Sequence, residues 1–228
     1  MANCVLLDMP VAAYNSRAYF EQTTLNPVMT AYEYARILID EAHEADPMRN
    51  AEGKAQELIY ADRMEAWTRR LVLGPSPLLR LAARCQHLER WSLPRAAYPE
   101  GRAGYHAWRS ELYRRQAARA RELLLKAEIS EEDANEVATW VSKTHLKTNT
   151  GTQTLEDAAV LVFLEYEIGT FAAQHPDYTT EKYIDILRKT WRKLSVSGKR
   201  AAQALNLPPE IAELLQAAIK KDAERRVG

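Results

Sequence analysis

Five arginines occupy a segment that is also rich in aromatic side chains: Arg84, Arg90, Arg95, Arg102 and Arg109. A guanidinium group can donate two parallel hydrogen bonds to a phosphate or carboxylate, so this density predicts an anion-binding site. A helix expected to begin at Gly101 places Arg102, His106 and Arg109 on one side. We interpret Arg90, Arg102 and Arg109 as an anion clamp, with the neighbouring aromatic residues filling the core or stacking on a ligand.

Acidic side chains on apolar helix faces form a second group of candidates. With residues placed every 100° around a helix, Glu57 shares the face of Tyr60, and Glu89 shares the face of Cys85. Asp157 lies near the centre of a face of aliphatic residues, in the predicted helix TLEDAAVLVFLEYEIGTF. A carboxylate buried without a partner is costly, whereas helical bundles build metal sites from inward carboxylates and histidines. Inward acids on separate helices therefore predict a shared site.

Glu57, His87 and Asp157 would give oxygen-rich ligation with one imidazole, which suits manganese, iron or magnesium better than zinc. Two structural interpretations compete with this metal site. Asp157 stands three positions after Thr154 and can close a capping box at a helix start, and each acid can pair with an arginine. His87 is itself expected among arginines such as Arg84, which would favour an anion over a cation.

The composition restricts the partners and the compartment. With 31 basic and 31 acidic residues the net charge is zero, so no overall field attracts nucleic acid or an anionic membrane. The two cysteines, Cys4 and Cys85, form no disulfide framework and fit a reducing, intracellular and cytoplasmic protein. Asp8 and Pro10 interrupt the apolar N-terminal residues, so we expect neither a signal peptide nor a membrane-spanning helix.

The chain is expected to be all-α, a single bundle of seven or eight helices without strands, because glycine is scarce and alternating patterns are absent. Residues 1–29 are interpreted as an irregular N-terminal extension, and residues 30–228 as a single helical domain that opens with a capping box at Thr30. Further helix starts are expected at the following residues: Ser76, Ser130, Thr154, Thr180 and, in the basic segment 188–200, Ser195.

Six blocks of the chain resemble the entirely helical family known as domain of unknown function 4202: ELIYADRM, QHLERWSLPRAAYP, RAGYHAWR, KTHLK, QTLEDAAVLVFLE and ILRKTWRKLS. The resemblance extends from about Thr30 to Asp222 and brings no established activity. It departs in the loop after Lys147, where TNTGTQ replaces an acidic, proline-containing stretch. The resemblance implies these recurring polar positions: Glu57, Tyr60, Arg63, His87, Arg90, Arg95, Tyr98, Arg102, Tyr105, Arg109, Lys143, Lys147, Glu156 and Asp157.

The order Glu57, His87, Asp157 is also similar in arrangement to helical His-Asp metal phosphohydrolases, although no His-Asp dipeptide occurs in the chain. The leading interpretation is a metal-dependent hydrolase of a phosphorylated small molecule or nucleotide, in which the metal activates water. The predicted catalytic residues are Tyr60, Lys143 and Glu156. The predicted substrate-binding residues are Arg63, Arg90, Arg95, Arg102, Tyr105, Arg109 and Lys147.

The alternative is a non-catalytic helical module that binds a small anion or a partner protein through an arginine-rich pocket, with the acids paired to the arginines. His87 distinguishes the two interpretations, because a metal ligand must turn towards Glu57 and Asp157. RNA binding by the arginine segment is disfavoured by the zero net charge.

Overall fold

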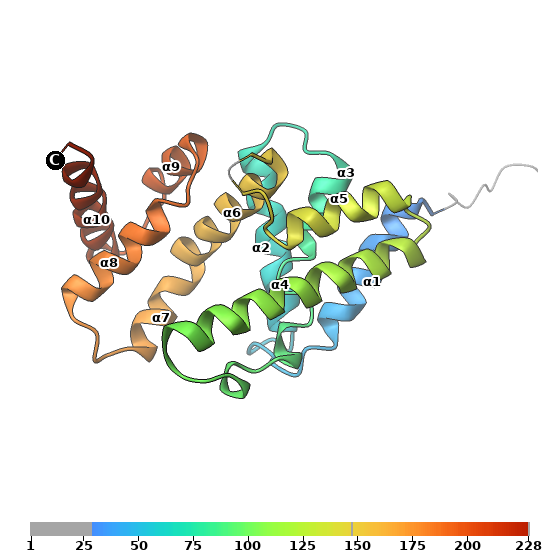
Figure 1. Ribbon diagram of the computed structural model, residues 1–228, viewed down its shortest axis with the longest axis horizontal. Helices are drawn as coiled ribbons and strands as arrows, with labels where there is room; N and C mark the ends of the chain where they lie inside the picture. The colour runs from blue at the N-terminus through green and yellow to red at the C-terminus, as the bar shows by residue number, and fades with distance from the viewer. Residues whose placement is uncertain (1–28, 147, 228) are drawn as a thin grey trace, which may run out of the picture. The chain divides into compact units, whose positions relative to one another are not determined.

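The computed structural model describes residues 29–146 and 148–227 (Figure 1). The extension predicted for residues 1–29 lies outside the described residues except for its last position. The described helices are α1 (Ala31–Glu44), α2 (Gln56–Leu71), α3 (Pro77–Arg84), α4 (Gly101–Lys126), α5 (Glu131–Val141), α6 (Thr150–Val162), α7 (Ile168–Gln174), α8 (Thr180–Trp191), α9 (Val196–Gln203) and α10 (Pro209–Val227). Two 3-10 turns, η1 (Arg90–Ser92) and η2 (Arg95–Ala97), precede α4, and the π-helix η3 (Phe163–Glu167) joins α6 to α7.

The all-α prediction is confirmed, since the described residues contain ten α-helices and no strand, only an isolated bridge between Arg49 and Ala55. The helix count is above the predicted seven or eight. One reason is that the predicted helix around Asp157 divides into α6, η3 and α7. None of the described helices is both long enough and apolar enough to cross a membrane.

The predicted start at Ser76 is confirmed, because its side chain accepts a hydrogen bond from the amide of Leu79 and Pro77 takes the first helical position. Ser130 caps α5 in the same way by accepting from the amide of Asp133. Thr179, one residue before the predicted Thr180, caps α8.

The predicted helix start at Thr154 is wrong. Helix α6 begins four residues earlier, where the side chain of Asn149 accepts a hydrogen bond from the amide of Thr152 at 3.0 Å. Thr154 lies inside the helix and donates its hydroxyl to the carbonyl of Thr150 at 2.9 Å. A capping box at Thr154 therefore does not explain the inward position of Asp157.

The hydrophobic core surrounds α2, whose Tyr60, Met64 and Trp67 are buried. Helices α3 and α6 pack against α2, while α4 lies beside α5 and α8 lies beside α10 (Figure 1). Burial of an aliphatic or aromatic side chain contributes roughly 1.5–3 kcal/mol, so the packing on α2 fixes the helices that carry the site described below.

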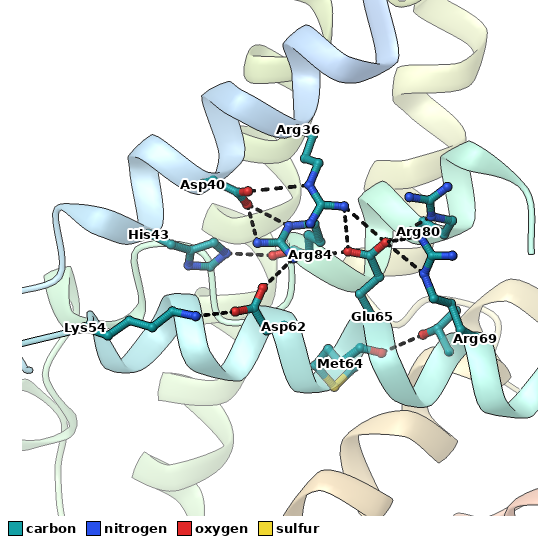
Figure 2. Close-up of polar contacts among 11 residues, drawn as sticks. Arg36, Asp40, His43, Lys54, Asp62, Met64, Glu65, Arg69, Arg80 and Arg84 are labelled. Carbon is teal, nitrogen blue, oxygen red and sulfur yellow. Dashed lines mark hydrogen bonds and ion pairs between the residues drawn. The ribbon is translucent and has the colours of Figure 1, made fainter. Parts of the chain in front are cut away.

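A buried ion network joins α1, α2 and α3 (Figure 2). Arg84 is only 2 % exposed and donates to Asp40 at 2.6 Å, to Asp62 at 2.8 Å and to Glu65 at 3.1 Å. His43 is also buried and contacts the backbone carbonyl of Arg84 through Nε2 at 2.6 Å. Removing one partner from a buried network costs about 3–5 kcal/mol. Arg84 is therefore a structural residue.

Glu65 is the centre of the same network in Figure 2, since four arginines from three helices donate to it. These arginines are Arg36, Arg69, Arg80 and Arg84. They hold the pKa of the Glu65 carboxyl below its ordinary value, although burial alone would raise it. The first arginine of the segment 84–109 is thus used for folding, and only the later ones remain for a site.

Candidate functional site

The polypeptide leaves helical geometry directly after α3, and this break turns His87 towards α2. Helix α3 ends at Arg84, and both His87 and Glu89 adopt positive φ angles, of 62° and 51°. The predicted inward position of Glu89 is wrong, because the helix that would have turned it inward ends five residues earlier. Its carboxylate instead accepts from Arg119 Nε at 2.8 Å, and its side chain is one-third exposed.

A cavity of about 390 Å³ lies between α2, the segment after α3, α4, the turn after α5, α6, η3, α7 and α8. This volume suits a small molecule. Seven residues predicted from the sequence line it: Tyr60, His87, Arg90, Tyr105, Arg109, Lys143 and Glu156. A neighbouring cavity of about 540 Å³ shares Tyr60, His87 and Arg90 with the first and adds Glu57 and Arg63.

His87 is the most tightly defined side chain of the cavity. Its ring stacks on Tyr60 with 3.8 Å between centroids and 8° between planes. Its Nδ1 lies 3.3 Å from Glu57 Oε2, and its Nε2 lies 2.8 Å from a terminal nitrogen of Arg90. A guanidinium only donates, so Nε2 must accept and the proton of the neutral ring is on Nδ1, facing Glu57.

Electrostatics keep this imidazole neutral. Burial lowers the pKa of His87 well below its ordinary value, and the charges of Arg90 and Lys143 lower it further. Burial raises the pKa of Glu57 to about 8, against the opposing effect of Arg90. Burial also raises the pKa of the Tyr60 hydroxyl. Near neutral pH, His87, Glu57 and Tyr60 are therefore uncharged. The charges beside them are those of the cations.

Lys143 and Glu156 form another part of the cavity wall. Glu156 Oε2 accepts from Lys143 Nζ at 2.5 Å, and its other oxygen lies 3.2 Å from Lys193 Nζ. Burial alone would raise the pKa of Glu156, but the two lysines lower it to about 2. This single carboxylate faces two lysines, so the pair of lysines is not fully neutralised.

Arg90 and Arg109 also bring unneutralised charge to the cavity. Throughout residues 29–146 and 148–227 neither guanidinium lies within ion-pairing distance of a carboxylate, in contrast to Arg84. Arg90 lies over the ring of Trp108 at 5.2 Å, and Arg109 lies over Tyr113 at 4.9 Å. The cavity thus gathers four cations, Arg90, Arg109, Lys143 and Lys193, around two carboxyl groups: Glu156, which is ionised, and Glu167, whose pKa is raised by burial.

Irregular backbone is concentrated at the same place. Lys143, like His87, has a positive φ angle, of 58°, which non-glycine residues rarely adopt. The π-helix η3 contributes Phe163 and Glu167 to the wall. Such conformations cost free energy and collect at functional sites. The backbone therefore points to the same cavity as the charges.

Asp157, the third residue of the predicted metal site, has a different environment. Its carboxylate accepts from the amide of Ser195 at 2.8 Å, from the Ser195 hydroxyl and from Gln153 at 2.9 Å. Gly198 packs against it so closely that a Cβ atom would lie 2.7 Å from the carboxyl carbon. Asp157 therefore anchors the start of α9, the helix that the sequence predicted from Ser195.

Glu57, His87 and Asp157 consequently do not converge. The one lone pair of neutral His87 already accepts from Arg90, so it offers none to a cation. Among the residues that the structure describes, no three acidic, histidine or cysteine side chains are grouped closely enough to hold a metal ion. Asp157 thus has other partners than Glu57 and His87 in this structure, and a metal at these residues stays a prediction.

The remaining predicted residues lie outside the 390 Å³ cavity. Arg63 lies over the ring of Tyr166 at 4.2 Å, in the neighbouring cavity. Arg95 donates to the carbonyls of Tyr98 and Pro99, both at 2.9 Å, and so braces the turn before α4. Arg102 is exposed and donates to His106 at 3.4 Å. Lys147 lies outside the described residues.

The cavity residues that were not predicted as site residues include Gln116, Glu167 and Lys193. Gln116 is 3 % exposed and its side-chain nitrogen has no hydrogen-bond partner in the described structure. Continuing the predicted face of α4 by two turns beyond Arg109 would have reached it. Burial raises the pKa of the Glu167 carboxyl.

Comparison with known proteins gives one match. The sequence model of a family described as "Domain of unknown function (DUF4202)" matches residues 33–215, well over half of the chain. No curated protein and no solved structure matches.

Proposed function

Since this chain belongs to the DUF4202 family, whose description assigns no activity, we propose a function from its cavity: the protein binds a small anionic molecule there, through a phosphate or carboxylate group. The observation that carries the proposal is the charge at the wall. Arg90 and Arg109 have no carboxylate partner among the described residues, and Lys143 and Lys193 share a single Glu156.

The hydrogen-bonding groups at the wall fit an anion as well as the charges do. Gln116 presents a buried amide nitrogen that lacks an acceptor, and buried donors are almost always satisfied in folded proteins. Arg109 can offer a planar pair of donors, which matches the oxygens of a phosphate or carboxylate. An anion in the cavity would supply the acceptors that these side chains lack.

The size and the aromatic residues of the cavity restrict the ligand further. About 390 Å³ accommodates a molecule the size of a sugar phosphate or a mononucleotide. Tyr105, Tyr113 and Phe163 provide apolar surface beside the cations. The ligand that fits best has one anionic group and a compact organic part.

The proposal favours the binding-module interpretation over the metal-dependent hydrolase. In the hydrolase, Glu57, His87 and Asp157 would have to face one ion, whereas Asp157 holds α9 and His87 faces Arg90. The binding-module interpretation paired the acids with the arginines. Arg90 and Arg109 do not pair with these acids in the described structure, so both guanidinium groups are left for an external anion. The anion-binding role therefore requires no metal.

Isothermal titration calorimetry with inorganic phosphate, followed by phosphate monoesters and dicarboxylates, tests the proposal. Arg109→Gln removes one charged donor from the cavity, and Arg102→Gln removes the same charge from the exposed part of α4. A hydrogen bond to a charged group contributes about 1.5–3 kcal/mol, so we expect Arg109→Gln to weaken binding about 10- to 100-fold. Arg102→Gln should bind as the unaltered protein does. Equal affinity of the unaltered protein and Arg109→Gln would place the anion elsewhere.

A further inference from the structure

The contact between Arg90 and His87 has a chemical consequence that rests on the proposed anion site. We propose that an anion bound by Arg90 draws its guanidinium away from His87, and that the released Nε2 then acts as a general base towards the ligand or a water molecule in the cavity. Binding of the anion and exposure of the base would thus be one event.

In the unliganded protein the base is blocked by Arg90. The lone pair of Nε2 accepts from Arg90 at 2.8 Å and cannot take up a proton while that bond persists. The rest of the ring is already arranged for base catalysis. Glu57 holds the Nδ1 side at 3.3 Å, and Tyr60 fixes the plane of the ring by stacking. A carboxyl group behind a histidine fixes the orientation and the tautomer of the ring.

Arg90 is free to respond to an anion. It lies on the short turn η1 rather than on a long helix, and no carboxylate in the described structure pairs with it. It lines three neighbouring cavities, so its side chain adjoins open space on several sides. A phosphate or carboxylate oxygen carries negative charge, so its hydrogen bond to a guanidinium is also an ion pair, an attraction that a neutral imidazole does not provide. A phosphate or carboxylate should therefore displace the imidazole nitrogen as the partner of Arg90.

The proton-transfer step balances without a further reactant. A hydroxyl of the ligand or a water molecule loses its proton, the electron pair of the broken O–H bond stays on oxygen, and a new N–H bond forms at Nε2 of His87. The ring becomes an imidazolium whose Nδ1–H faces Glu57. The deprotonated oxygen is then a nucleophile beside an anionic group already held by Arg90 and Arg109.

Titratable and charged groups from every neighbouring element surround His87, and each affects the proton transfer to Nε2. They are Glu57 and Tyr60 on α2, His43 on α1, Arg90 on η1, Arg109 on α4, Lys143 after α5, Glu156 on α6 and Glu167 on η3. The cations disfavour the imidazolium. An anion that neutralises Arg90 therefore favours the imidazolium in two ways, because the anion frees the lone pair of Nε2 and reduces the repulsion from Arg90.

Nitrogen NMR of the histidine rings in the full-length protein tests the inference without any assay of activity. His87→Gln assigns the His87 signals among the five histidines. In the unliganded protein we expect a neutral ring with its proton on Nδ1. Arg90→Met removes the donor while keeping a long side chain, and should raise the pKa of His87 by about 1–3 units. Arg102→Gln, which removes the exposed contact to His106, should leave His87 unchanged.

Inorganic phosphate is then added to the unaltered protein, with binding followed by calorimetry. Support would be a change of the Nε2 signal and a rise in the pKa of His87 that saturate with the same affinity as phosphate. If phosphate binds and His87 does not change, because Arg90 uses its other N–H groups, the inference is overturned while the anion site stands. No binding of phosphate at all would overturn the anion site and the inference together. An unchanged pKa in Arg90→Met would show that Arg90 does not restrain His87.

Discussion

The raised pKa of Glu57 makes a sharp prediction about stability. In the folded protein this carboxyl has a pKa of about 8, compared with an ordinary value of 4.5 for an unfolded chain. A group whose folded pKa is raised contributes its full stability below pH 4.5 and loses it as the pH rises to about 8, because the unfolded chain gives up the proton first. Glu57→Gln keeps the shape and has no proton to lose.

The size of the effect follows from the pKa difference. One unit corresponds to about 1.36 kcal/mol, so the three units between pH 5 and pH 8 give at most about 4 kcal/mol. The side chain is 15 % exposed, and partial access of water reduces this value to an expected 2–4 kcal/mol, an order-of-magnitude figure.

Urea unfolding of the unaltered protein and Glu57→Gln at pH 5 and pH 8.5 measures the difference. We expect the variant to gain stability relative to the unaltered protein on going from pH 5 to pH 8.5. The control Glu52→Gln alters an exposed carboxyl on the loop before α2 and should run parallel to the unaltered protein. If the stability difference between Glu57→Gln and the unaltered protein were the same at both pH values, the buried, protonated state of Glu57 would be refuted.

Two further predictions follow from Asp157 and His87. Gly198→Ala should destabilise the protein by about 1–3 kcal/mol in urea unfolding, because the new Cβ would lie 2.7 Å from the Asp157 carboxyl carbon. The control is Gly169→Ala in α7, where a Cβ atom would meet open space, so this substitution should be neutral or stabilising. Equal effects at the two glycines would contradict the anchoring role of Asp157. Protein purified without chelator should contain far less than one equivalent of manganese or iron by elemental analysis, because the lone pair of His87 already accepts a hydrogen bond from Arg90. A stoichiometric metal that is lost in Asp157→Ala would contradict this structure of the site.

The helical nature of the chain could be predicted because it depends on local signals. Ser76, Ser130 and Thr179 cap helices with their own side chains, and each of these contacts spans three residues. The start of α6 was missed for an equally local reason, since Asn149 and Thr154 both resemble caps and only one is used. The π-helix η3 has no comparable signal, so α6 and α7 were predicted as one helix.

The composition of the site could be predicted only in part, because the sequence does not show which charges neutralise each other. Arg84 and Arg90 are six residues apart in the same basic segment. Arg84 pairs with Asp40, which is 44 residues away, whereas Arg90 meets no carboxylate in the described structure. The end of α3 at Arg84 separates the two. Helical periodicity continued past this point places Glu89 inward, and this position changes once the helix stops, whereas His87 still lies beside Arg90.

The same distribution of charge supports the proposed anion site over a space left by packing alone. Four cations outnumber the two carboxyl groups of Glu156 and Glu167 at the wall, and their mutual repulsion lowers the stability of the fold without a bound anion. The positive φ angles of His87 and Lys143 add a further cost at the same wall. A fold that needed only stability would pair these cations, as it pairs Arg84. An anion that binds the folded chain would relieve the repulsion, so its binding energy adds directly to the stability of the protein.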